Sequence, residues 1–156
     1  MFDNVQINIP GGLDFEVPKM VKVKQNFEDH KIDDVALAVK NEINKPAITN
    51  SIKSGASIAI GVGSRGVANI DIAVKSLVSC LKELGAKPFI FPAIGSHGGG
   101  TVENQTALLA GYGVTEEKVG AEVRATMDTV VPVVLNDSTK VHMDKFAYEA
   151  DGVILI

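Results

Sequence analysis

The sequence predicts an α/β domain whose mainly parallel sheet is flanked by helices, with an added N-terminal strand and a hairpin. Apolar runs at 57–62, where only Ser57 is polar, at 88–94 and at 153–156 are typical of strands buried on both faces. Stretches with the apolar spacing of amphipathic helices follow the first two runs. This alternation favours parallel pairing, because each helix returns the chain to the same end of the sheet. We expect residues 1–156 to form one such domain.

An N-terminal strand and a helix are expected before the first buried run. Residues 1–19 contain turn-forming prolines and glycines and predict a short strand and a turn. Apolar and polar side chains alternate over residues 20–24, which predicts an edge or antiparallel strand. Apolar residues at helical spacing then predict a helix from about Ile32 to Ile43. It carries two aspartates in its first turn and is ended or kinked by Pro46.

The elements after the first buried strand follow the same reasoning. A helix is expected over 70–84, with Gly85 as its C-terminal signal. Another helix should run over about 101–110 after the second strand. Residues 115–119 predict a short helical turn capped by a threonine hydroxyl. Residues 129–143 predict a hairpin, because two strand-like runs flank an Asn-Asp-Ser turn.

Charge and composition restrict the classes of function. The net charge is −4 at pH 7, with 46% hydrophobic and 22% charged residues. The chain therefore lacks the basic face that binding to nucleic-acid phosphates requires, and no apolar run approaches the ~18 residues that span a bilayer. The single cysteine, Cys80, fits a reducing compartment and is expected to be a packed thiol. We expect a cytoplasmic protein without nucleic-acid or membrane partners, and the sequence leaves homo-oligomerisation open.

Two glycine-rich loops follow the first two buried strands. The first is Gly61-Val-Gly-Ser-Arg-Gly66, and the second is Gly95-Ser-His-Gly-Gly-Gly-Thr101. Ligands of open α/β sheets bind at the carboxyl ends of the strands. If the two strands are neighbours, Arg65 and His97 therefore project toward one cleft.

The first loop matches the G-x-G-x-x-G spacing of dinucleotide-binding loops at Gly61, Gly63 and Gly66. Such a site also needs a carboxylate at the end of the second strand, about 20 residues further on, to bind a ribose hydroxyl. The second strand ends without one, and Glu83, at that spacing, lies in the preceding predicted helix. Because the glycine spacing is present and the carboxylate is missing, we keep an NAD-binding oxidoreductase domain as an alternative prediction only.

Arg65 and His97 together favour chemistry on a small carboxylate. A guanidinium holds a carboxylate through two parallel hydrogen bonds, and histidine exchanges a proton near neutral pH. Two alternatives stay open. Arg65 pairs with an acid of the next loop while His97 caps a helix, or the loops form a non-catalytic module that binds a carboxylate or a phosphate. Thr101 is expected to cap the following helix, to bind a phosphate at its N-terminus, or both.

The other two histidines carry weaker signals. His30 follows two acidic residues just before a helix and is expected in a solvated loop. His142 alternates with apolar residues in the predicted hairpin and is expected on a strand surface. The three histidines are not spaced along the sequence as metal ligands usually are, so the sequence predicts no self-contained metal site.

The two loops resemble those of the nickel-dependent lactate racemase family, in particular homologues with the loops Gly63-Ser-Arg-Gly66 and Gly95-Ser-His-Gly-Gly99. The resemblance extends to residues 18–25, 84–89, 92–97 and 149–153. It covers most of these 156 residues but only the N-terminal part of a family member. It implies a two-domain enzyme that binds a nickel-pincer nucleotide in the cleft between its domains.

The resemblance also implies roles for residues of this chain. His97 matches the first of two acid/base histidines, which takes the proton of the substrate hydroxyl while the α-hydride passes to the cofactor. Return of the hydride to the other face of the keto acid inverts the centre. Arg65 matches the arginine that holds the substrate carboxylate, and Ser64 stands beside it where lactate racemases carry threonine. The residues expected to contact the cofactor are Gly63, Gly66, Gly98, Gly99 and Thr101.

Two positions depart from lactate racemases. Val62 stands where they carry an acidic residue, and Gly98 stands where they carry an arginine. The resemblance thus implies a racemase or epimerase of a 2-hydroxy acid whose identity stays open. The tethering lysine, the nickel-binding histidine and the second acid/base histidine match parts of the family beyond Ile156. We therefore expect these 156 residues to be inactive alone, and the final strand of aliphatic residues agrees with a chain that continues.

Overall fold

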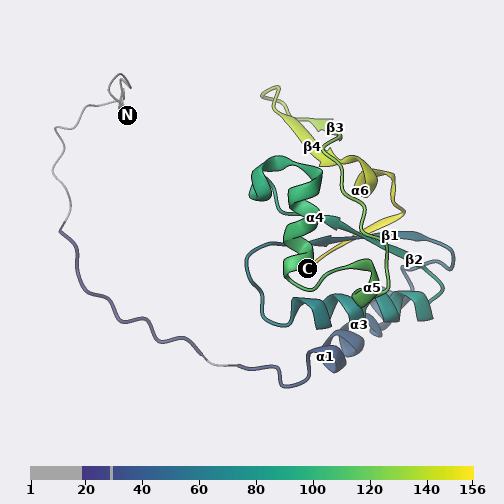
Figure 1. Ribbon diagram of the computed structural model, residues 1–156, viewed down its shortest axis with the longest axis horizontal. Coiled ribbons are helices and arrows are strands. Elements are labelled where there is room, and N and C mark those ends of the chain that lie inside the picture. The colour runs from purple at the N-terminus through teal and green to yellow at the C-terminus, as the bar shows by residue number, and fades with distance from the viewer. Residues whose placement is uncertain (1–18, 29) are drawn as a thin grey trace. The chain divides into compact units, whose positions relative to one another are not determined.

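Figure 1 shows the computed structural model, which describes residues 19–28 and 30–156. Its contacts divide the chain into residues 1–31 and residues 32–156. In the second unit the elements in chain order are α1 (Val35–Ile43), α2 (Pro46–Thr49), β1 (Ser57–Val62), α3 (Ile70–Glu83), β2 (Lys87–Pro92), η1 (His97–Gly100), α4 (Val102–Gly111), α5 (Glu116–Val119), β3 (Thr129–Val134), β4 (Lys140–Asp144), α6 (Lys145–Glu149) and β5 (Gly152–Leu155).

The strand predicted over residues 20–24 is wrong. Residues 19–28 contain neither helix nor strand. Alternation of side chains makes a segment suitable for one face of a sheet, but a strand forms only where a neighbouring backbone pairs with its N–H and C=O groups. No described residue provides such a ladder for 19–28. Apart from Lys19, the strand and turn predicted over residues 1–19 lie outside the described residues.

The sheet of residues 32–156 confirms the predicted α/β class. Its strands lie in the order β2-β1-β5 and all run parallel. Ile60 in the central strand lies opposite Ile90 on one side and Ile154 on the other. A short segment continues the sheet past β2, because the Ile90 N–H donates to the Glu122 carbonyl at 2.8 Å and the Ile90 carbonyl accepts from the Arg124 N–H at 2.8 Å.

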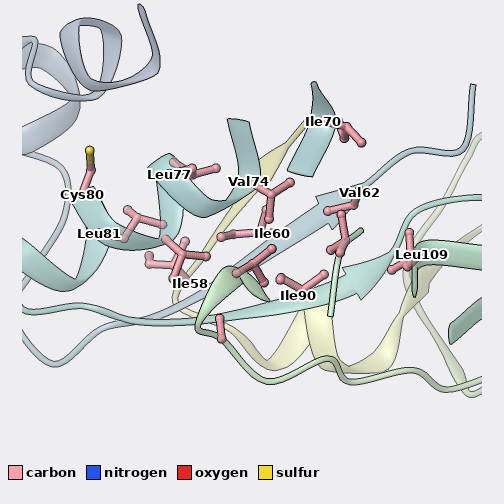
Figure 2. Close-up of a cluster of buried hydrophobic side chains, with 14 of the residues drawn as sticks. Ile58, Ile60, Val62, Ile70, Val74, Leu77, Cys80, Leu81, Ile90 and Leu109 are labelled. Carbon is pink, nitrogen blue, oxygen red and sulfur yellow. The ribbon is translucent and has the colours of Figure 1, made fainter. Parts of the chain in front are cut away.

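Helix α3 covers one face of this sheet. Its apolar stripe recurs every three to four residues, as the sequence predicts. Figure 2 shows Val74, Leu77 and Leu81 of this stripe directed at the strand side chains Ile58, Ile60 and Ile90. Burying a side chain of this size contributes about 1.5–3 kcal/mol to folding. The core beneath α3 is therefore a main source of the stability that holds β1 and β2 in place.

The ends of the helices follow ordinary capping chemistry. The Asp34 carboxylate accepts from the Leu37 N–H at 2.9 Å, so Asp34 is the N-cap of α1 and not a residue of its first turn. Gly85 adopts a φ of +79° directly after the C-cap of α3. Thr115 accepts from the Lys118 N–H, which confirms the predicted capped turn at α5. Cys80 is buried, and its sulfur points away from the strands (Figure 2).

The opposite face of the sheet carries α6 and the hairpin β3-β4 (Figure 1). Ala59, Phe89, Phe91 and Ala147 form a second small core there. The hairpin is antiparallel with an irregular register, as predicted apart from that irregularity. At its turn the backbone N–H and the side chain of Thr139 hydrogen-bond to the Asp137 carboxylate, which lowers the pKa of that carboxyl. Within the described part of the chain, none of the helices combines the length and the apolar character needed to cross a bilayer.

The packing of α3 predicts a contrast between two leucine substitutions on helices. Leu81 is fully buried against the sheet, whereas Leu37 on α1 is 52% exposed. We expect Leu81→Ala to lower the free energy of unfolding by about 2–5 kcal/mol, because it leaves a cavity in the core. Leu37→Ala should cost less than about 1 kcal/mol. Urea unfolding followed by circular dichroism measures both, and equal losses would contradict this account of the core.

Candidate functional site

The two glycine loops lie together at one end of the sheet, as predicted. Strands β1 and β2 are neighbours and parallel, so their carboxyl ends share one edge. The Ala93 N–H, just after β2, donates to the carbonyl of Val62 at 3.0 Å and fixes how the two chain segments leave the sheet. The loops that follow carry Ser64 and Arg65 on one side and His97 on the other.

A hydrogen bond between side chains joins the loops. The Ser64 Oγ and the His97 Nδ1 lie 2.7 Å apart, and both side chains are half-buried. Which of the two groups donates depends on the histidine tautomer. In either case Nδ1 is engaged, so Nε2 is the ring nitrogen that remains for a ligand. The family resemblance predicts that Ser64 contacts the substrate. In the structure its hydroxyl contacts His97.

Arg65 follows Ser64 directly in the chain, and its guanidinium has no partner among the described residues. The residue is exposed, and within the described residues it has no hydrogen bond or ion pair. The alternative in which Arg65 pairs with an acid of the next loop is therefore not what the structure shows. Gly66, the next residue, adopts a φ of +69°, which a side chain would strain. The turn thus presents a free cation next to the serine that contacts His97.

Backbone conformation shapes the second loop. Gly98, Gly99 and Gly100 all adopt left-handed φ values near +70°. A Cβ on Gly98 would lie 3.1 Å from the backbone carbon of Asn104, so this glycine is required by close packing as well as by φ. Thr101 accepts from the Asn104 N–H at 3.3 Å and is the N-cap of α4, as predicted. His97 therefore does not cap this helix.

Gln105 of α4 and Tyr112, the C-cap of this helix, hydrogen-bond to the two loops. Neither residue was identified from the sequence as part of the site. The Gln105 Nε2 donates to the Gly95 carbonyl at 2.8 Å, and the Tyr112 hydroxyl donates to the Ser64 carbonyl at 3.1 Å. Gln105 lies on the buried side of the helix, where the periodic pattern calls for an apolar residue. A polar side chain at such a position was the available signal, because buried amides need partners.

The first loop does not have the geometry of a dinucleotide-binding loop. In that motif the glycines open a helix whose N-terminus faces the pyrophosphate. Here Gly61 lies inside β1, where a Cβ would meet Phe91 at 2.7 Å and Leu155 at 2.8 Å. Helix α3 begins only at Ile70, four residues after Gly66. The glycine spacing therefore reflects close packing and a turn, and the NAD-binding alternative gains no support.

A cavity of about 670 Å³ lies elsewhere, at the amino ends of β1 and β5. Its lining includes Ile48, Lys53, Ile58 and Asp151. The Asp151 carboxylate already accepts from the Ser57 N–H at 2.8 Å, so it is committed to the strand end. We place the candidate site at the glycine loops instead, because ligands of open parallel sheets bind at the carboxyl ends.

The other two histidines each have a hydrogen-bond partner close by in the chain or in the same hairpin. The His30 ring lies 3.0 Å from the Glu28 carboxylate and is exposed. His142 is exposed on β4, and its Nδ1 lies 2.9 Å from the Thr129 hydroxyl. Among residues 19–28 and 30–156, no three His, Cys, Asp or Glu side chains gather as a metal site would require.

These observations bear on the nickel-pincer nucleotide that the family resemblance implies. The resemblance assigns the nickel-binding histidine to a part of the family pattern beyond Ile156, and the described residues contain no cluster of three His, Cys, Asp or Glu side chains. The left-handed glycines before α4 and the threonine cap leave backbone N–H groups at a helix N-terminus, which suits an anionic part of a cofactor.

Comparisons with known proteins returned nothing for this chain. A scan against protein-family models, a search of curated proteins and a search of solved structures each found no match. The resemblance to the lactate racemase family therefore stays a prediction from the loop motifs.

The geometry of the second loop predicts a contrast between two of its glycines. Gly98→Ala should destabilise the fold more than Gly100→Ala. A Cβ at Gly98 meets Asn104 backbone, whereas one at Gly100 meets nothing within 4 Å, and both positions have similar left-handed φ values. Gly100→Ala isolates the conformational strain, about 1–2 kcal/mol. Urea unfolding of both variants measures the difference, and an equal loss would show that the contact with α4 is unimportant.

Proposed function

We propose that this chain supplies the carboxylate-binding and proton-transferring part of a 2-hydroxy acid racemase or epimerase similar to lactate racemase. The observation that carries the proposal is the Ser64–His97 hydrogen bond of 2.7 Å. It joins the two glycine loops and puts an imidazole beside the loop that presents Arg65. Racemisation of such a substrate needs two things from these residues. One is a cation that binds the carboxylate, and the other is a group that accepts and returns the hydroxyl proton.

Arg65 would hold the substrate carboxylate. Its guanidinium is exposed and free of partners within the described residues, and its planar fork matches two carboxylate oxygens. Gly66, directly after it, has open space where a side chain would stand. A ligand can therefore approach the backbone of this turn closely.

His97 would accept the proton of the substrate hydroxyl through Nε2, in the tautomer whose Nδ1–H donates to the Ser64 Oγ. Ser64 engages Nδ1 and thereby fixes the orientation of the ring. A base that is oriented in this way loses little freedom when the substrate binds, which is how positioned acid/base groups accelerate proton transfer. Racemisation also needs a hydride acceptor, a role that the nickel-pincer nucleotide fills when bound.

Binding by Arg65 can be tested with a matched control. Arg65→Gln should weaken binding of a 2-hydroxy carboxylate by about 10- to 100-fold, because charge-assisted hydrogen bonds contribute about 1.5–3 kcal/mol. Arg124→Gln removes the other arginine of the chain, which pairs with Glu122 and stacks on Phe89, and should leave binding unchanged. Amide chemical shifts of both loops during titration with L- and D-lactate report the affinity. Equal weakening in the two variants would contradict a specific role for Arg65. Saturable binding of NADH in the same assay would favour the oxidoreductase alternative instead.

Proton transfer by His97 predicts a loss of turnover with little loss of binding. In the complete natural protein, His97→Ala should lower racemisation by about 10²–10⁴-fold, the usual contribution of a general base. His142→Ala, on the exposed face of the hairpin, is the control and should keep full activity. Inversion of the α-centre is followed by chiral chromatography. Unchanged turnover in His97→Ala would overturn the proposal, and binding without any turnover in the wild type would favour a non-catalytic carboxylate-binding module.

A further inference from the structure

Gln105 is a polar side chain placed on the core side of α4. It is 5% exposed and is the one polar residue in the described part of the chain that is buried to this extent. A buried amide is costly unless it is hydrogen-bonded. Its Nε2 donates to the Gly95 carbonyl at 2.8 Å, two residues before His97. Gly95 itself has a left-handed φ of +61°, so this bond holds a turn that few residues could adopt.

Tyr112 makes the corresponding contact with the other loop. It is half-buried at the C-cap of α4, and its hydroxyl donates to the Ser64 carbonyl at 3.1 Å. Positions 105 and 112 are seven residues apart, which places both on one face of the helix, about 10 Å along its axis. Leu109 lies between them on the same side and is fully buried. The helix is therefore anchored in the core between its two polar contacts.

These contacts close a ring through the site. From α4, Gln105 reaches the loop of His97, His97 bonds to Ser64, and Ser64 is held from α4 by Tyr112. Each loop is thus fixed to the same rigid element as well as to the other loop. Separate anchors would allow the loops to move independently, whereas a shared helix keeps the spacing between them constant.

We infer that Gln105 and Tyr112 are positioning residues, and that α4 sets the distance between the Arg65 loop and the His97 loop for a bound 2-hydroxy acid. This inference rests on the proposed function, because it assigns the two residues to proton transfer on that substrate. Neither side chain needs to touch the substrate. Both act through backbone carbonyls of the loops that carry the binding groups.

The decisive variant is Tyr112→Phe, which removes one hydroxyl, with Tyr148→Phe as its control. Tyr148 is the other tyrosine of the chain and is exposed on α6. In the complete natural protein we expect Tyr112→Phe to lower kcat by about 10- to 100-fold, because small misplacements of a base reduce rates on this scale. The Kd of the 2-hydroxy acid should change less than about 3-fold, since the charge-assisted bonds that Arg65 makes to the carboxylate are retained. Tyr148→Phe should change neither. A kcat within about twofold of wild type in Tyr112→Phe would overturn the inference.

Gln105→Met tests the second contact, because methionine has similar length and no donor, and Gln25→Met is the exposed control. We expect Gln105→Met, like Tyr112→Phe, to lower kcat while the Kd of the 2-hydroxy acid is retained. If Gln105→Met does not fold, Tyr112→Phe still decides the inference.

A substrate-free measurement separates this inference from the proposed function. Ring nitrogen resonances of His97 in ¹⁵N spectra should shift in Tyr112→Phe and stay unchanged in Tyr148→Phe. If the wild type neither binds nor turns over 2-hydroxy acids while this shift is seen, the proposed function fails and the positioning by α4 stands. Unchanged His97 resonances together with a lower unfolding midpoint would show that Tyr112 only stabilises the fold, and would overturn the inference.

Discussion

The parallel pairing of β1 with β2 is the constraint on which the candidate site depends. Parallel strands that are direct neighbours end at the same edge of the sheet, so the loops after them must start side by side. Ile60 and Ile90 lie opposite each other at the centre of this pair and are fully buried beneath α3. The core under the helix therefore stabilises the placement of the two loops.

Hydrogen bonds, more than ion pairs, organise the site. The loops are joined by the Ser64–His97 contact and held by Gln105 and Tyr112, while the neighbouring cation, Arg65, is left exposed. This division has a physical advantage. A guanidinium already paired with a carboxylate must be separated from it before it binds another anion, whereas a free one loses only its hydration.

Glycines in the two loops serve different needs, although they look alike in sequence. Gly61 makes room for Phe91 and Leu155 inside the sheet, and Gly98 makes room for the backbone at Asn104. Gly66 and Gly95 have open space where a Cβ would stand and are required by their positive φ values. A spacing such as G-x-G-x-x-G therefore has no single physical meaning, and here it does not describe a phosphate-binding turn.

The sequence alone predicted the three strands of the parallel sheet, the buried face of α3, the hairpin and the two loops at strand ends, because apolar periodicity and turn residues act over short stretches of chain. It did not predict the short helices α2 and α6. It was also wrong to expect both faces of the last strand to be buried, because β5 is an edge strand of the sheet that leaves Val153 and Leu155 exposed. It wrongly predicted a strand at residues 20–24, because strand formation depends on pairing with another segment of backbone, about which a local pattern carries no information. It also treated Arg65 and His97 as one functional pair. Only the tertiary structure decided that Ser64 bonds to His97, and that Gln105 and Tyr112 hold both loops, because these contacts join residues that the folding of the sheet and α4 brings together.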